Sequence, residues 1–125
     1  GCGQFCTNPG LIIGIRSAEF SEFVAGLADA IGAQPAQTML NAGTLRSYTN
    51  GVAQLKGHAK VSHLAGNEQA GNQAQPQLFK ADVSMLLEGD HLLQEEVFGP
   101  TTIVVEVADS AELTRALRLQ AGVLR

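Results

Sequence analysis

Cys6 is the residue with the clearest capacity for covalent chemistry. It lies in Gly1–Gly10, where three glycines and an Asn-Pro pair predict a loop. A cysteine attacks only as its thiolate, so the site must lower the thiol pKa or supply a base. Gly3 lets a ligand approach the backbone, and loop N–H groups can stabilise a developing oxyanion. From composition and spacing alone, a buried and inert Cys6 is still the slightly better interpretation.

A second candidate segment is Glu95–Pro100, in which two acidic residues precede Val97, Phe98 and a Gly-Pro break. The pattern alone favours a solvated helix end beside a turn, because adjacent acidic residues usually face water. Phe98 is as readily explained by packing in the core as by contact with a ligand.

Metal and phosphate sites have weaker support in the sequence. Cys2 and Cys6 are four positions apart, but the nearest histidines, His58 and His63, are much further along the chain than in ordinary zinc sites. The glycine pattern before Cys6 lacks the preceding strand that a dinucleotide-binding loop requires. We therefore expect no metal site, a small core residue in Cys2, and surface or loop positions for His58, His63 and His91.

Strands and helices alternate along the chain and would have to position these segments. The continuous apolar run Leu11–Ile15 predicts a strand buried on both faces, and the β-branched run Thr101–Val107 predicts another. Ser17 is a suitable N-cap for a helix that ends near Gly32, with Phe20, Phe23 and Leu27 as a core stripe. Further expected elements are a helix over Ala42–Lys56, strands over Lys60–Ala65 and Gln77–Val83, an exposed loop over Gly66–Pro76, a helical turn over Ser84–Leu87, and a helix capped by Asp109 or Ser110 that runs to about Gln120.

This alternation predicts an α/β fold, a mostly parallel sheet with flanking helices. The chain of 125 residues suits one domain, and 45% hydrophobic residues suit a packed core. A net charge of −4 with scattered basic residues argues against nucleic acid as a partner. No segment has the roughly 20 apolar residues of a membrane span. Two cysteines make no disulfide framework, so a reducing cytoplasm is the expected location.

The exact amino-acid sequences of the two candidate segments indicate more about function than the spacing of their residues does. Gly3–Gly10 (GQFCTNPG) resembles the active-site cysteine loop of the aldehyde dehydrogenase superfamily, and Glu95–Pro100 (EEVFGP) resembles its second signature, in the family's order. The resemblance covers nearly the whole chain and is weakest in Leu113–Arg125. Within the superfamily, GQFCTNPG and the later Pro35–Leu40 (PAQTML) look most like the 2,5-dioxopentanoate (α-ketoglutarate semialdehyde) dehydrogenases.

The resemblance implies a role for each candidate residue. Cys6 would be the catalytic nucleophile, forming a thiohemiacetal and then a thioester, with NADP or NAD as the cofactor. Glu96 would hydrogen-bond the nicotinamide ribose, and Phe98 would pack against the nicotinamide end. Phe5 and Thr7 would line the aldehyde tunnel. A homo-oligomer is implied only for the full-length protein.

The resemblance also implies that important parts lie outside this chain. The family's general-base glutamate, its oxyanion asparagine and nearly all of its dinucleotide-binding domain precede the cysteine. Residues 1–125 are therefore expected to be a partial catalytic domain, inactive by itself. The competing interpretation is a non-catalytic α/β module that keeps the scaffold and serves in binding or interaction.

Overall fold

A computed structural model describes residues 5–8, 10–38, 42–67, 73–89 and 101–123 of the chain. Its centre is a five-stranded sheet with the order β1-β2-β7-β6-β4. The strands of this sheet are β1 (Phe5–Asn8), β2 (Leu11–Ile15), β4 (Val61–Ala65), β6 (Gln77–Ala81) and β7 (Thr101–Val107). A separate two-stranded sheet joins β3 (Gln37–Thr38) to β5 (Gln73–Ala74).

The three central strands are parallel, and the two outer strands are antiparallel. β2 pairs with β7 in the register Leu11↔Ile103, and β6 pairs with β7 in the register Gln77↔Thr101. β1 and β4 run against their neighbours at the two edges. The predicted α/β class with a mostly parallel sheet is confirmed, in the form of a mixed sheet with a parallel centre.

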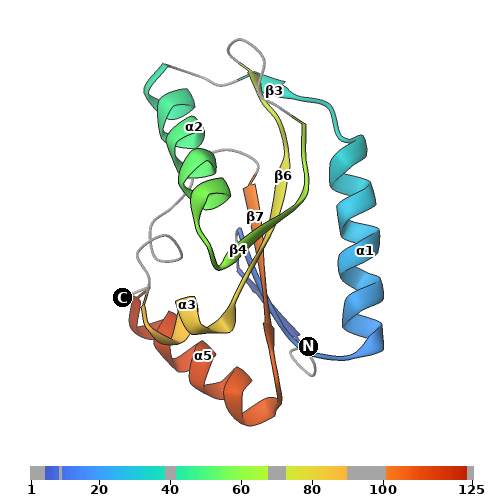
Figure 1. Ribbon diagram of the computed structural model, residues 1–125, viewed down its shortest axis with the longest axis vertical. Coiled ribbons are helices and arrows are strands. Elements are labelled where there is room, and N and C mark those ends of the chain that lie inside the picture. The colour runs from blue at the N-terminus through green and yellow to red at the C-terminus, as the bar shows by residue number, and fades with distance from the viewer. Residues whose placement is uncertain (1–4, 9, 39–41, 68–72, 90–100, 124–125) are drawn as a thin grey trace.

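Helices cover both faces of the sheet (Figure 1). The helix α1 (Ala18–Ala33) lies on one face, where Phe20 and Ile31 pack with Val104 and other strand residues. The opposite face carries α2 (Ala42–Gly57), α3 (Val83–Leu87) and α5 (Ser110–Val123). Their buried residues, Tyr48 and Leu113 among them, pack with Phe79 and Val105 in a second, larger core. The central strands are therefore apolar on both faces, and each face packs into one of the two cores.

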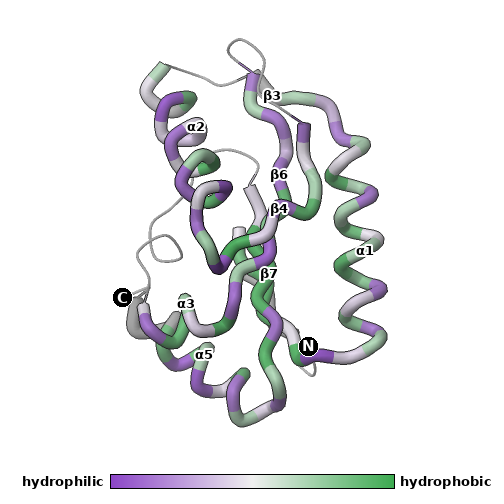
Figure 2. Tube along the Cα trace, viewed as in Figure 1, coloured by the Kyte–Doolittle hydropathy of each residue, from purple (hydrophilic) through white to green (hydrophobic). Residues whose placement is uncertain are grey.

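The hydropathy pattern explains this layering. Figure 2 shows β7 as mainly apolar, whereas polar and apolar residues alternate along the helices. Val104, Val105 and Val107 are fully buried although they point to different faces of the sheet. A helix needs only one apolar stripe, because its other side meets water.

Polar side chains cap the helices where the sequence predicts it. Phe20 donates its backbone N–H to Ser17 Oγ at 3.0 Å at the start of α1. At α5, Glu112 donates its N–H to Asp109 Oδ1 at 2.9 Å, and Ala108 donates to Glu112 Oε1 at 2.9 Å. Asp109 therefore caps this helix and Ser110 does not, while the Glu112 carboxylate satisfies the N–H of the residue before the cap.

Several expected elements differ in the structure. The predicted loop over Gly1–Gly10 contains β1, because Asn8 pairs with Leu11 across a tight turn. The strand predicted to run to Val83 ends at Ala81, since Asp82 accepts the Ser84 N–H at 2.9 Å and caps α3. Phe23 is 38% exposed and only Phe20 of its stripe is fully buried, so the predicted core stripe is narrower than expected.

The sheet and α1 approach each other unusually closely at one point. A Cβ placed on Gly14 of β2 would lie 2.2 Å from the Phe20 ring, far inside van der Waals contact. Glycine therefore lets the aromatic ring pack directly on the strand backbone.

Candidate active site

The last residue of the first motif lies beside the residue that follows the second motif in the sequence, whereas Cys6 itself pairs with Ile13 in the middle of β2. The residues that end the first motif and follow the second, Gly10 and Thr101, stand at the N-terminal ends of the neighbouring strands β2 and β7. Gly10 accepts a hydrogen bond from Ile103 N–H at 2.8 Å, and a Cβ on Gly10 would lie 3.4 Å from the Thr101 carbonyl oxygen. Sequence positions that are far apart thus meet in one place.

The predicted nucleophile has a defined backbone position. Cys6 lies in β1, between Phe5 and Thr7, and pairs with Ile13 of β2. β1 is the end strand of the five-stranded sheet. The side chains of Phe5, Cys6 and Thr7 lie outside what the structure describes. Residues 90–100, with Glu95, Glu96 and Phe98, also lie outside the described residues, so their predicted roles stay predictions.

Thr101 places an unusual polar group at this edge. Its side chain is 7% exposed, and its Oγ1 has no hydrogen-bond partner within the described parts of the chain. A buried hydroxyl without a partner is costly, on the order of 1–3 kcal/mol. The buried Thr101 hydroxyl is therefore expected to serve a function at this position.

Beside Thr101, a network of hydrogen bonds surrounds the amide of Gln77, which is 1% exposed. Gln77 Nε2 donates to the Asn67 carbonyl at 2.8 Å and to Tyr48 Oη at 3.4 Å. Gln77 Oε1 lies 2.7 Å from His63 Nε2. The network ties three neighbouring elements to the start of β6.

Tyr48 anchors the same network from α2. Its hydroxyl donates to the Gln75 carbonyl oxygen, and its side chain is 1% exposed. Burial raises the pKa of Tyr48, because the phenolate would lose its hydration, while the hydrogen bonds with Gln77 and Gln75 act in the opposite direction. The hydroxyl is thereby kept as a neutral donor.

Sequence reasoning missed this network. The sequence assigned no role to Tyr48 or Gln77, and it predicted a surface or loop position for His63. His63 is indeed exposed, yet it bonds Gln77 and packs on Phe79 with ring centroids 5.0 Å apart. The available signal was a glutamine at the start of an otherwise apolar strand, where burial demands partners.

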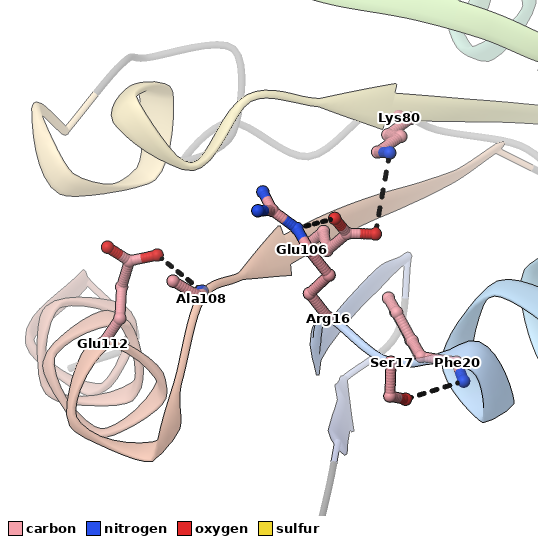
Figure 3. Close-up of polar contacts among 7 residues, drawn as sticks. All are labelled: Arg16, Ser17, Phe20, Lys80, Glu106, Ala108 and Glu112. Atoms are coloured by element: carbon pink, nitrogen blue, oxygen red, sulfur yellow. Dashed lines mark hydrogen bonds and ion pairs between the residues drawn. The ribbon is translucent and has the colours of Figure 1, made fainter.

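The opposite end of the parallel strands carries an ion cluster instead (Figure 3). Arg16 Nε contacts Glu106 Oε1 at 2.7 Å, and Lys80 Nζ lies 3.7 Å from Glu106 Oε2. The Arg16 and Lys80 side chains are 71% and 45% exposed, whereas the Glu106 side chain between them is 16% exposed. Ion pairs whose cations stay in solvent contribute little to stability.

Metal and membrane sites receive no support from the described residues. Among them, no group of three or more His, Cys, Asp or Glu side chains could hold a metal ion. His58, one of the histidines considered above, accepts the Lys60 N–H on Nδ1 at 3.0 Å. Within the same ranges, no helix is long and apolar enough to cross a membrane.

Solved structures identify the class of fold. The chain superposes on an NAD-dependent benzaldehyde dehydrogenase from Corynebacterium glutamicum with a TM-score of 0.70 and 19% identity, over 89% of this chain and 24% of that one. An aldehyde dehydrogenase from Bacillus cereus gives a TM-score of 0.69 and 19% identity, over 91% and 25%. The fold of the chain is therefore similar to a part of the fold of each of these two enzymes.

Curated relatives agree at the level of sequence. The chain is 48% identical to alpha-ketoglutaric semialdehyde dehydrogenase from Acinetobacter baylyi and 33% identical to alpha-ketoglutaric semialdehyde dehydrogenase 2 from Azospirillum brasilense. Each match covers 99% of this chain and 24% of the relative. No family profile matches the chain. The predicted resemblance is confirmed: the chain is similar to part of these aldehyde dehydrogenases and spans about a quarter of the length of the curated relatives it matches.

Proposed function

We propose that this chain is the cysteine-bearing part of the catalytic domain of an NAD(P)-dependent aldehyde dehydrogenase. The observation that carries the proposal is the contact of Gly10 with β7, because it brings the ends of the two motifs to one edge of the sheet. The names of the relatives favour 2,5-dioxopentanoate, which is α-ketoglutarate semialdehyde, as the aldehyde. The dinucleotide-binding domain would lie outside residues 1–125.

Cys6 would act as the nucleophile in this reaction. Its thiolate adds to the aldehyde carbonyl carbon, and the carbonyl oxygen becomes the oxyanion of a thiohemiacetal. Loss of hydride from this carbon leaves a thioester, and water then releases the carboxylic acid and restores the thiol. Covalent attachment divides one difficult oxidation into two easier steps.

A nicotinamide dinucleotide, when bound, accepts the hydride. The segment that precedes Thr101 in the sequence carries residue types that suit it, because the Glu96 carboxylate can accept hydrogen bonds from ribose hydroxyls and the Phe98 ring can pack on the nicotinamide. The Thr101 hydroxyl, which has no hydrogen-bond partner among the described residues, could bond a polar group of a ligand there. Phe5 and Thr7, on either side of Cys6 in β1, would line the approach of the aldehyde.

Substitution of Cys6 tests this function in the complete protein that carries this sequence. Cys6→Ser is expected to lower kcat for 2,5-dioxopentanoate by at least about a thousandfold with NAD or NADP, because a hydroxyl is a far weaker nucleophile near neutral pH. The measurement is the absorbance of the reduced dinucleotide. Cys2→Ser is the matched control and should retain turnover.

The 125-residue chain alone is expected to be inactive, because the family resemblance places the general-base glutamate and nearly all of the dinucleotide-binding domain outside residues 1–125. Full turnover by the Cys6→Ser protein would refute the mechanism. Turnover of benzaldehyde but not of 2,5-dioxopentanoate would refute only the substrate. A protein that oxidises no aldehyde would favour the non-catalytic module instead. Homo-oligomerisation of the complete protein, tested by light scattering, is part of the same proposal.

A further inference from the structure

We propose that Gln77 is a positioning residue, whose buried amide fixes the N-terminal ends of β6 and β7, where Gly10 of the first motif bonds β7 and where Thr101 follows the second motif in the sequence. The inference rests on the proposed function and adds to it a residue that neither motif contains. Gln77 would touch neither the aldehyde nor the dinucleotide and would act through the backbone of β7.

The first step is that the Gln77 amide is held in one orientation. Both of its N–H donors are used, one by the Asn67 carbonyl and one by Tyr48 Oη. Its Oε1 must therefore accept, so His63 donates from Nε2. An amide that is 1% exposed and bonded on both sides has little freedom to rotate.

The second step is that this fixed amide stands beside the motif edge. Gln77 and Thr101 are paired as the first residues of β6 and β7, and both side chains are buried. Two residues further along β7, Ile103 N–H bonds the Gly10 carbonyl. A rigid start of β6 thus limits the positions available to Thr101, and through β7 to Gly10.

The third step is that the surroundings are shaped for this side chain. Gly66 has φ 123, and a Cβ there would lie 2.3 Å from Gln77 Oε1. The chain after β4 therefore passes against the amide with no room for a side chain. Tyr48 reaches the same place from α2 and holds the Gln75 carbonyl, which is two residues before Gln77. The segment after β4, the helix α2 and the residues just before β6 are thus joined around the Gln77 amide.

The test compares Gln77→Met, Tyr48→Phe and Val107→Ala with the unsubstituted complete protein. Methionine keeps the length and apolar volume of glutamine but removes every hydrogen bond of the amide. Val107 is fully buried at the other end of β7 and controls for a loss of stability alone. The readouts are dinucleotide KM, aldehyde KM, kcat, and hydrogen exchange of peptides that contain Ile103.

Gln77→Met is expected to raise the dinucleotide KM on the order of tenfold, more than it raises the aldehyde KM, because the Glu96 segment adjoins Thr101 directly. Exchange in the Ile103 peptide should accelerate on the order of tenfold as the edge loosens. Tyr48→Phe should shift both readouts less and in the same direction, which provides a milder variant if Gln77→Met folds poorly. Val107→Ala should leave the dinucleotide KM unchanged and should accelerate Ile103 exchange less than Gln77→Met does, through lost stability alone.

Equal effects of Gln77→Met and Val107→Ala on KM and exchange would overturn the positioning role. So would an unchanged Ile103 exchange rate in Gln77→Met, or faster exchange with unaltered kinetic constants. Failure of the proposed function has a different signature, which is undiminished turnover by Cys6→Ser or no aldehyde oxidation by the unsubstituted protein.

Discussion

The two ends of the parallel strands β2, β7 and β6 differ in how far their polar side chains are buried. At their N-terminal ends, Gln77 and Thr101 are polar and buried. At their C-terminal ends, Arg16, Lys80 and Glu106 form ion pairs that reach solvent. Buried polar groups are stable in only a few geometries, whereas exposed ions tolerate many. The difference indicates that the N-terminal end of these three strands has the more closely specified geometry.

Among the substitutions that test this difference, Gly66→Ala is expected to have the largest effect on the free energy of unfolding. The new methyl group would meet Gln77 Oε1 at 2.3 Å and the Pro76 carbonyl at 2.6 Å, at a φ that alanine rarely adopts. We expect a loss of about 3 kcal/mol in the free energy of unfolding, from strain and overpacking together. Urea denaturation measures it.

Gly26→Ala is the matched control for this change. Gly26 lies within α1, and a Cβ there meets nothing within 4 Å. Alanine should stabilise the helix by about 0.5–1 kcal/mol. If both alanine variants shift stability equally, the N-terminal edge is no more closely specified than the helix surface.

A smaller effect is expected from Tyr48→Phe, which removes the hydroxyl that holds the Gln75 carbonyl. The expected loss is about 1 kcal/mol near pH 8. Because the Tyr48 pKa in the folded protein is raised above 10.0, the neutral hydroxyl contributes stability that is complete below about pH 10 and declines as the pH rises further.

The pH dependence of this variant provides its own internal check. The difference between the unsubstituted protein and Tyr48→Phe should shrink as the pH rises above about 10, since the unfolded tyrosine then ionises more readily than the folded one. Urea titrations at about pH 8 and about pH 11 measure the change. A difference that grows with pH would contradict the effect of burial on this phenol.

The smallest effect is expected from Glu106→Gln at the opposite end. The substitution removes both ion pairs of the cluster, but Arg16 and Lys80 remain solvated. The change in the free energy of unfolding should be below that of Tyr48→Phe, and it should shrink in about 1 M salt, where the screening length is about 3 Å. A larger effect than that of Tyr48→Phe, insensitive to salt, would reverse the contrast between the two ends.

Local sequence signals were sufficient for most of the scaffold. The strand at Leu11–Ile15 and the strand at Thr101–Val107 have the predicted bounds, because unbroken apolar runs identify buried central strands. The Ser17 cap and the helix from Ala42 were also predicted, to within a residue at its end. Capping and periodicity depend on near neighbours, which the sequence displays directly.

Features that depend on distant partners were not predicted. The strand β1 exists through its pairing with β2, and its residues have no clear strand pattern of their own. The Gln77 network joins residues from α2, β4 and the segment after β4. Hydrogen-bond partners that far apart leave no local periodicity. The motif residues themselves were identified by resemblance, and the roles of Cys6, Glu96 and Phe98 stay predictions.

The close approach of Gly14 to Phe20 has a consequence for sequence variation. Because the ring occupies the space that a side chain at position 14 would need, the two positions are expected to vary together. A relative with alanine or serine at the first position should carry a smaller residue than phenylalanine at the second. A library randomised at both positions and selected for folded protein should recover such compensating pairs and few variants that are large at both.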